Sequence, residues 1–260
     1  MTGWTAAAMA ELTSAERQVA DLLQIDADPA AARAVLDEVP YWFHTFALNQ
    51  ANGIYTPGYA RDHRYRIPAI PRSFERLAVL DIGTFDGFYA FLAEARGAER
   101  VLAIDNEQYT EWVRSRWGVE LDGGEGFRAI HALLDSRVEY RKLDALELDR
   151  LEDRFDLIFC CGILHRVEAP ARLMRVLSRR LAEGGKVLIE THGVFADPHD
   201  GHPIHRYGPG EVYPHDEFVY WGFTPAGIEL LGRKNGFLGF ELVDAPMIDG
   251  HPRIIGWLRP

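Results

Sequence analysis

The chain has 260 residues, of which 47% are hydrophobic and 26% charged, and its formal net charge is −11. This length fits one large globular domain, or one domain with an appended cap, and no apolar run reaches the roughly 20 residues that span a membrane. The acidic balance argues against a partner that presents many phosphates, so a small-molecule substrate is favoured over nucleic acid.

The first residues lack the basic and apolar segments of a secretory signal. The only two cysteines, Cys160 and Cys161, are adjacent and cannot readily bridge to each other. We therefore expect a cytoplasmic protein with reduced cysteines and no disulfide framework.

Residues 1–76 are expected to form an N-terminal helical and aromatic cap. Apolar residues recur at helical spacing between Ser14 and Val39, which predicts two short helices, the second beginning at Asp28-Pro29. Residues 41–71 are rich in aromatic side chains and broken by glycine and proline, which predicts an irregular segment over a pocket. These aromatic residues could equally be core residues of the cap.

Residues 77–260 are expected to form an α/β domain. Strands are predicted at residues 78–82, 100–104, 138–142, 155–161 and 186–190, with helices between them and a glycine turn at Gly184-Gly185. Two later segments, 240–243 and 253–258, predict an antiparallel hairpin at one edge. The alternation of strands and helices predicts a doubly wound, mainly parallel sheet of seven strands.

The turn after the first of these strands reads Asp81-Ile82-Gly83-Thr84-Phe85-Asp86-Gly87. It lies at the sheet edge where open α/β folds bind nucleotide-like ligands. The carboxylates of Asp81 and Asp86 would repel a pyrophosphate but can accept hydrogen bonds from an ammonium group. Asp105, after the second strand, can bind ribose hydroxyls, although it could instead cap a helix, and Glu107 is a near alternative. A ligand with an amino-acid end and a nucleoside end fits this pattern, and S-adenosylmethionine is such a ligand.

Residues 77–193 resemble class I S-adenosylmethionine-dependent methyltransferases, which have a Rossmann-like fold. VLDIGTFDG resembles the glycine-rich first motif of that family, with Phe85 in place of the middle glycine, and FDLIFCCGILHRVEAP and LAEGGKVLIET resemble later motifs. The predicted cofactor-binding residues are Asp81, Gly83, Thr84, Asp86, Gly87, Asp105, Asn106, Asp144, Ala145, Cys161 and Gly162.

The segments WFHTFAL, GIYTPG, DIGTFDGFYAF and VLIETHG also resemble the tRNA wobble-uridine carboxymethyltransferase family. That family usually has a tyrosine where His165 stands, which helps to hold the carboxylate of carboxy-S-adenosylmethionine, and a lysine- and tryptophan-containing segment that this chain lacks. These departures and the net charge of −11 favour ordinary S-adenosylmethionine, released as S-adenosylhomocysteine, and a small-molecule acceptor. Modification of tRNA and a non-catalytic cofactor-binding role are the alternatives.

Methyl transfer to a hydroxyl group needs a base, and histidine is the usual choice near neutral pH. His165 and His192 follow the fourth and fifth strands, so they are the predicted catalytic residues, although either could be a polar loop residue without a catalytic role. The sequence thus favours a small-molecule O-methyltransferase of natural-product metabolism. Whether it forms a homo-oligomer is left open.

A segment rich in histidine and aspartate, residues 191–221, is predicted to be a loop that covers the substrate. A divalent metal is a weaker alternative, because these histidines lack a tight ligand spacing, and no metal site is assigned. The predicted substrate-binding residues are His44, Tyr213, Tyr220 and Trp221.

Overall fold

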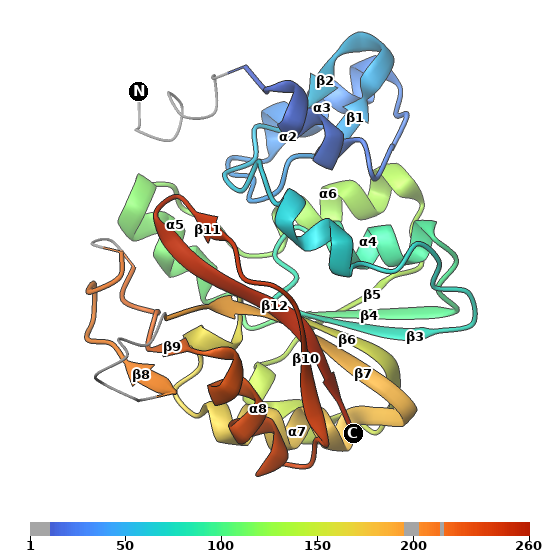
Figure 1. Ribbon diagram of the computed structural model, residues 1–260. Coiled ribbons are helices and arrows are strands. Elements are labelled where there is room, and N and C mark those ends of the chain that lie inside the picture. Colours follow the sequence, from blue (N-terminus) through green and yellow to red (C-terminus); the bar gives the residue numbers. More distant parts are fainter. Residues whose placement is uncertain (1–10, 195–202, 214–215) are drawn as a thin grey trace.

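The protein is described by a computed structural model that covers residues 11–194, 203–213 and 216–260. Its centre is a sheet with the strand order β10-β12-β7-β6-β3-β4-β5, beside which β11 pairs only with β12 (Figure 1). The neighbouring strands β5, β4, β3, β6 and β7 are all parallel. Strand β12 is antiparallel to both β7 and β10. The predicted doubly wound, mainly parallel fold is therefore confirmed, together with its antiparallel edge.

The strands of this sheet are β3 (Ala78–Ile82), β4 (Arg100–Asp105), β5 (Glu139–Lys142), β6 (Phe155–Cys161), β7 (Leu181–His192), β10 (Gly239–Asp244), β11 (Met247–Ile248) and β12 (His251–Arg259). The prediction for β7 was wrong at its start. The strand begins directly after the preceding helix, and Gly184 and Gly185 lie inside it instead of forming a turn before it.

The helices of the α/β domain are α4 (Phe88–Ala95), α5 (Tyr109–Trp117), α6 (Glu125–Leu134), α7 (Pro170–Arg180) and α8 (Pro225–Arg233), with short 3-10 helices η3 (Ala145–Arg150) and η4 (Leu164–Arg166). In the part of the chain that the structure describes, no helix combines the length and the apolar character needed to cross a membrane.

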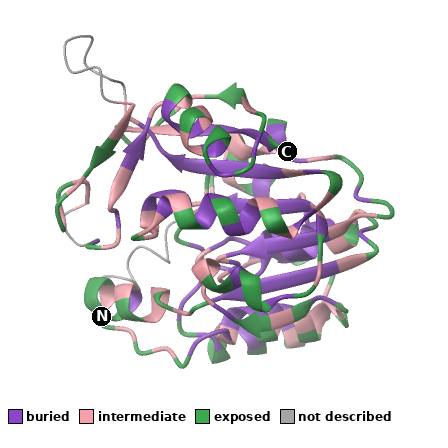
Figure 2. Ribbon diagram, turned by 90° about the horizontal axis from the view of Figure 1, so that it is seen from below, coloured by how far each residue is buried: buried purple, intermediate pink, exposed green. Residues whose placement is uncertain are grey.

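Side chains of the central strands alternate between two hydrophobic layers, one on each face of the sheet. Val79 of β3 packs in the layer with α4 and α6, and Leu80 packs in the layer with α7 and α8. Leu157 and Ile158 of β6 divide in the same way. A strand covered on both faces must be apolar on both, which explains the almost wholly apolar sequence of β6 and its burial. Figure 2 shows that the strands at the centre of the sheet are mostly buried.

The cap lies against the face of the sheet that carries α4 and α6 (Figure 1). Its elements are α2 (Ser14–Ala20), α3 (Pro29–Glu38), β1 (Ala47–Asn49), η1 (Gln50–Asn52), β2 (Ile54–Tyr55) and η2 (Arg64–Ala69). Both predicted helices are present, and Asp28 caps α3 as expected. The cap aromatic residues Trp42 and Phe46 are fully buried, and Phe46 packs on Phe88 of α4 with ring centroids 5.5 Å apart. The cap and the α/β domain thus share one hydrophobic core.

A small separate sheet is formed by residues of the segment 191–221 and the residues directly after it. It consists of β8 (Ile204–Arg206) and β9 (Trp221–Phe223), which pair in antiparallel fashion. Residues 195–202 and 214–215 of the predicted covering loop lie outside the described residues.

Gly58 allows the cap to fold closely on itself. A methyl group at Gly58 would overlap the carbonyl carbon of His44 and the amide nitrogen of Thr45, which are backbone atoms and cannot rotate away. We predict that Gly58→Ala lowers the free energy of unfolding by about 3 kcal/mol in urea denaturation, the upper range for overpacking. Gly239→Ala is the control, because its methyl group would meet only Arg233 Nη2, at 3.9 Å. Equal losses in the two variants would contradict the close approach.

Candidate active site

A cavity of about 1300 Å³ runs along the carboxyl edge of the parallel strands, between the cap, the turn after β3 and β12. The predicted residues that line it are Asp81, Gly83, Thr84, Asp105, Asn106, Asp144, Ala145, Cys161, Gly162, His44, His165, Tyr213 and Tyr220. The other four, Asp86, Gly87, His192 and Trp221, are not among the described residues that line it. A pocket for one drug-sized ligand measures about 300–1,000 Å³, so this cavity has room for two small molecules.

The turn after β3 is held by short polar contacts. Thr84 Oγ1 donates a hydrogen bond to Asp81 Oδ2 at 2.7 Å, and Phe85 N donates to Asp105 Oδ2 at 2.9 Å. Phe85, which replaces a glycine of the resembling motif, has a φ of +54°. Its ring stacks on Tyr109 and Phe43, with centroids 3.7 and 4.6 Å away, so packing offsets the cost of about 1–2 kcal/mol of the left-handed backbone.

Asp81 and Asp105 are buried carboxyl groups that face this cavity. Burial raises the pKa of each to about 6, although Thr84 opposes the rise at Asp81 and two backbone amides oppose it at Asp105. The helix α5 begins after Gln108, so Asp105 is not its cap, and Glu107 is not among the described cavity residues. A ligand that brings an ammonium group and hydroxyl groups to these carboxylates would restore part of the solvation that they lose on burial.

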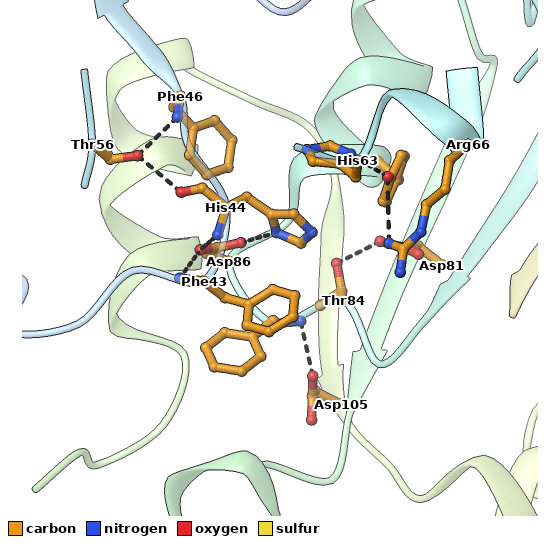
Figure 3. A network of polar contacts seen from close by, with 12 residues as sticks. Phe43, His44, Phe46, Thr56, His63, Arg66, Asp81, Thr84, Asp86 and Asp105 are labelled. Carbon is orange, nitrogen blue, oxygen red and sulfur yellow. Dashed lines mark hydrogen bonds and ion pairs between the residues drawn. The ribbon is translucent and has the colours of Figure 1, made fainter. Parts of the chain in front are cut away.

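Asp86 fastens the cap to the α/β domain. Its carboxylate accepts hydrogen bonds from the backbone amides of Phe43 and His44, both at 2.8 Å, and it pairs with His44 Nδ1 (Figure 3). Gly87 is covered by Phe91 and therefore lies away from the cavity. The structure thus uses Asp86, which the sequence suggested as a ligand of the cofactor, for contacts within the protein.

Glu190, at the end of β7, forms a buried ion cluster with two arginines. Its carboxylate accepts a hydrogen bond from Arg66 Nη2 at 2.7 Å and one from Arg253 Nε at 2.6 Å. These two cations hold the pKa of Glu190 below its usual range despite complete burial. Both arginines line the cavity, so the cluster gives its wall one excess positive charge. Sequence reasoning missed these residues, although an acid within the apolar segment VLIET was a signal that a charged partner must lie nearby.

His165 is 1% exposed and lines the cavity. Its Nδ1 accepts a hydrogen bond from the backbone amide of His192 at 3.2 Å and lies 3.2 Å from Thr191 Oγ1. Burial, together with nearby cations including Arg253, lowers the pKa of His165 well below its usual value. The neutral ring therefore carries its proton on Nε2, which can donate a hydrogen bond to a ligand.

His192 is buried behind the rings of Tyr213 and His251, whose centroids are 6.0 and 5.8 Å from its own. Burial and Arg253 lower the pKa of His192 to about 4. Trp221 donates its Nε1 hydrogen bond to the carbonyl of Val167 at 2.9 Å, and this contact holds β9 in place. Sequence reasoning did not single out His251, which lines the cavity.

No group of three or more histidine, cysteine, aspartate or glutamate side chains within the described ranges is arranged to hold a metal ion. Several of the histidines and aspartates of the segment 191–221 belong to residues 195–202 and 214–215, which lie outside the described ranges.

The sequence is similar to that of known methyltransferases. Residues 54–238 match a family model described as a methyltransferase domain. The chain is 22% identical over 182 residues to a tRNA U34 carboxymethyltransferase of Sulfurimonas denitrificans, which covers 70% of this chain and 55% of that relative. It is 30% identical over 119 residues to the protein of the same name from Campylobacter hominis, covering 46% and 37%. The chain thus spans about half the length of these curated relatives, or less.

Solved structures of similar fold include the N-terminal domain of EvdMO1 in the presence of SAH and D-fucose. The TM-score is 0.63 at 18% identity, and the match covers 88% of this chain and 95% of that one. An S-adenosylmethionine-dependent methyltransferase from Mesorhizobium loti matches with a TM-score of 0.53 at 22% identity, covering 76% and 99%. At these identities the likeness supports the fold.

The ion cluster at Glu190 makes a stability prediction. Glu190→Gln leaves Arg66 and Arg253 buried without their shared carboxylate, so we predict a loss of about 3 kcal/mol in the free energy of unfolding, measured with urea. The matched control is Glu229→Gln, which removes an exposed pair with Arg233 on α8 and should cost less than about 0.5 kcal/mol. A loss at Glu190 no larger than at Glu229 would contradict the cluster.

Proposed function

The chain belongs to the methyltransferase-domain family, and we propose that it transfers the methyl group of S-adenosylmethionine to an oxygen atom of a small molecule, as in natural-product metabolism. The observation that carries the proposal is the cavity of about 1300 Å³, which has a volume large enough for a nucleoside cofactor and a second small molecule. The net charge of −11 also favours a small acceptor over a polyanion.

The residues of the cavity fit the cofactor. Asp105 would hold the ribose hydroxyls and Asp81 the ammonium group, since both are buried carboxyl groups that face the cavity. Asn106 Nδ2 donates a hydrogen bond to Asp144 Oδ2 at 2.8 Å, and this pair would border the adenine with Ala145. When bound, S-adenosylmethionine supplies a methyl group activated by its sulfonium centre.

The protein's own contribution to methyl transfer is positioning and exclusion of water. His165 would hold the acceptor oxygen through its Nε2 proton, and Tyr213 and Tyr220 line the same part of the cavity. The imidazole of His251, which also lines it, would accept the proton that the hydroxyl group loses as its oxygen receives the methyl group. His192 orients His165 through its backbone amide. A role of the His192 side chain as a base stays a prediction.

Modification of the wobble uridine of tRNA is the second candidate function. The name that the curated relatives carry supports it. The excess positive charge of Arg66 and Arg253 in the cavity wall also supports it, because such a wall could bind the carboxylate of carboxy-S-adenosylmethionine.

The test combines binding and transfer. Calorimetry with S-adenosylmethionine should show binding, and methyl-labelled cofactor should label a hydroxylated small molecule from a panel. Neither labelled S-adenosylmethionine nor labelled carboxy-S-adenosylmethionine should label tRNA. Label in tRNA would favour the second candidate, and binding without any transfer would favour a non-catalytic protein. Absence of binding at high micromolar protein concentration would contradict the proposal altogether.

The two cavity carboxyl groups give a pH prediction. Asp81 and Asp105 have pKa values of about 6 and would bind the cofactor when ionised, that is, above this pH. The dissociation constant of S-adenosylhomocysteine should therefore rise as the pH falls from 8 to 5. When the pH is one unit below the pKa, protonation of each carboxyl group should raise the constant by about tenfold. Asp105→Asn should weaken binding at pH 8 and reduce this pH dependence, as calorimetry can show. Equal affinity across the range would contradict these roles.

A further inference from the structure

Polar side chains of the cap meet the turn after β3 at one end of the cavity. His44, His63 and Arg66 come from the cap, whereas Asp81 lies near the end of β3 and Thr84 lies in the turn. We call these five residues the cap–turn cluster. All five line the cavity, and Figure 3 shows them gathered around a common space. The histidines, Asp81 and Thr84 are each less than 5% exposed.

Two donors of this cluster have no partner among the residues that the structure describes. His63 Nε2 and Arg66 Nε are buried and make no hydrogen bond. His63 Nδ1 lies 2.5 Å from the hydroxyl of Tyr89, and Arg66 Nη2 binds Glu190. Leaving a buried donor unpaired costs about 1–3 kcal/mol, so such atoms in a cavity wall point to a ligand that accepts their hydrogen bonds.

The proton of His63 can be assigned from its surroundings. Burial lowers the pKa of His63 well below its usual value, so the ring is neutral at pH 7. Burial also raises the pKa of Tyr89, which keeps its hydroxyl protonated and able to donate to His63 Nδ1. The ring proton then stands on Nε2, and His63 offers the cavity a hydrogen-bond donor.

His44 is fixed in place on the other side of this space. Asp86 binds its Nδ1 and its backbone amide, and Thr56 Oγ1 donates a hydrogen bond to its carbonyl oxygen at 2.9 Å. The rings of His44 and His63 are 5.4 Å apart. The unbonded edges of the two histidines are therefore held at a fixed separation by the fold.

The charges of the cap–turn cluster come from two parts of the chain. The carboxylate of Asp81 lies near the end of β3, whereas the guanidinium of Arg66 and the Nε2 donor of His63 belong to the cap. A pyrophosphate could accept hydrogen bonds from the donors of the cap but would be repelled by the carboxylate of Asp81. A zwitterion with one ammonium and one carboxylate group matches both sides.

We propose that the cap binds the carboxylate of the cofactor's amino-acid end, through His63 Nε2 and Arg66 Nε with His44 beside them, while Asp81 and Thr84 bind its ammonium group. The inference rests on the proposed function, because the zwitterion is that of S-adenosylmethionine. It moves His44 from the predicted substrate site to the cofactor site. The cap is then a part of the cofactor site as well as a cover over it.

The test compares two nucleosides by calorimetry. S-Adenosylhomocysteine carries the zwitterion, and 5′-deoxy-5′-methylthioadenosine has the same adenosine and sulfur without it. Wild-type protein should bind the first at least about tenfold more tightly, as expected for charge-assisted hydrogen bonds.

The variants His63→Asn and His44→Asn place an amide where Nδ1 was and remove Nε2, so the bonds to Tyr89 and Asp86 can persist. His63→Asn should raise the dissociation constant of S-adenosylhomocysteine about tenfold or more, with a smaller rise for His44→Asn, and should leave that of methylthioadenosine within about twofold. His131→Asn on α6, which is not among the described cavity residues, is the control and should change neither.

Three outcomes would overturn the inference. If wild-type protein binds both nucleosides equally, the amino-acid end adds no binding free energy through contacts with the cap. If His63→Asn weakens both nucleosides equally, the residue supports the fold and not the carboxylate. If neither nucleoside binds to wild-type protein, the proposed cofactor itself is wrong, and the inference fails with it.

Discussion

The carboxylate of Asp86 is the contact on which the arrangement of the site depends. It stands at the end of the turn after β3 and binds two backbone amides and one imidazole of the cap. A buried carboxylate with three donors is strongly held, because each donor replaces part of its lost hydration. The cap is thereby fixed directly over the turn, and residues of the cap become walls of the cavity.

Several charged side chains are buried around the cavity. Glu190 is fully buried between Arg66 and Arg253, and Asp81 and Asp105 are buried beside the cavity. Apolar residues of the same size would often fold as stably as such groups, so their presence points to binding. The arrangement of these charges gives the cavity one end suited to a zwitterion and a local excess of positive charge where Arg66 and Arg253 share Glu190.

The fold could be predicted well from the sequence because its signals are local. The apolar run Phe155–Cys161 and the capping residue Asp28 act within a few residues of themselves, and both segments have the predicted structure. The start of β7 was wrong because the paired glycines suggested a turn, whereas pairing of Leu181 with Phe155 draws the chain into the strand early. Pairing of that kind depends on a neighbouring strand, so the local sequence carries no signal of it.

The site was harder to predict, because its main contacts join distant parts of the chain. Asp86 meets Phe43 across 43 residues, and Arg66 meets Glu190 across 124. Motif spacing alone assigned Asp86 to the cofactor site. It could not show that the carboxylate of Asp86 accepts hydrogen bonds from the cap instead. Conversely, the residues that follow strand ends, such as Asp105 and His165, do line the cavity as predicted, since parallel strands end at a common edge.

A crystal structure with S-adenosylhomocysteine would test most directly whether the cap and the turn form one cofactor site. We predict that its ribose lies on Asp105, its ammonium group on Asp81, and its carboxylate within hydrogen-bond distance of His63 and Arg66. A cofactor whose amino-acid end points away from the cap, toward Tyr213 and β9, would contradict the account.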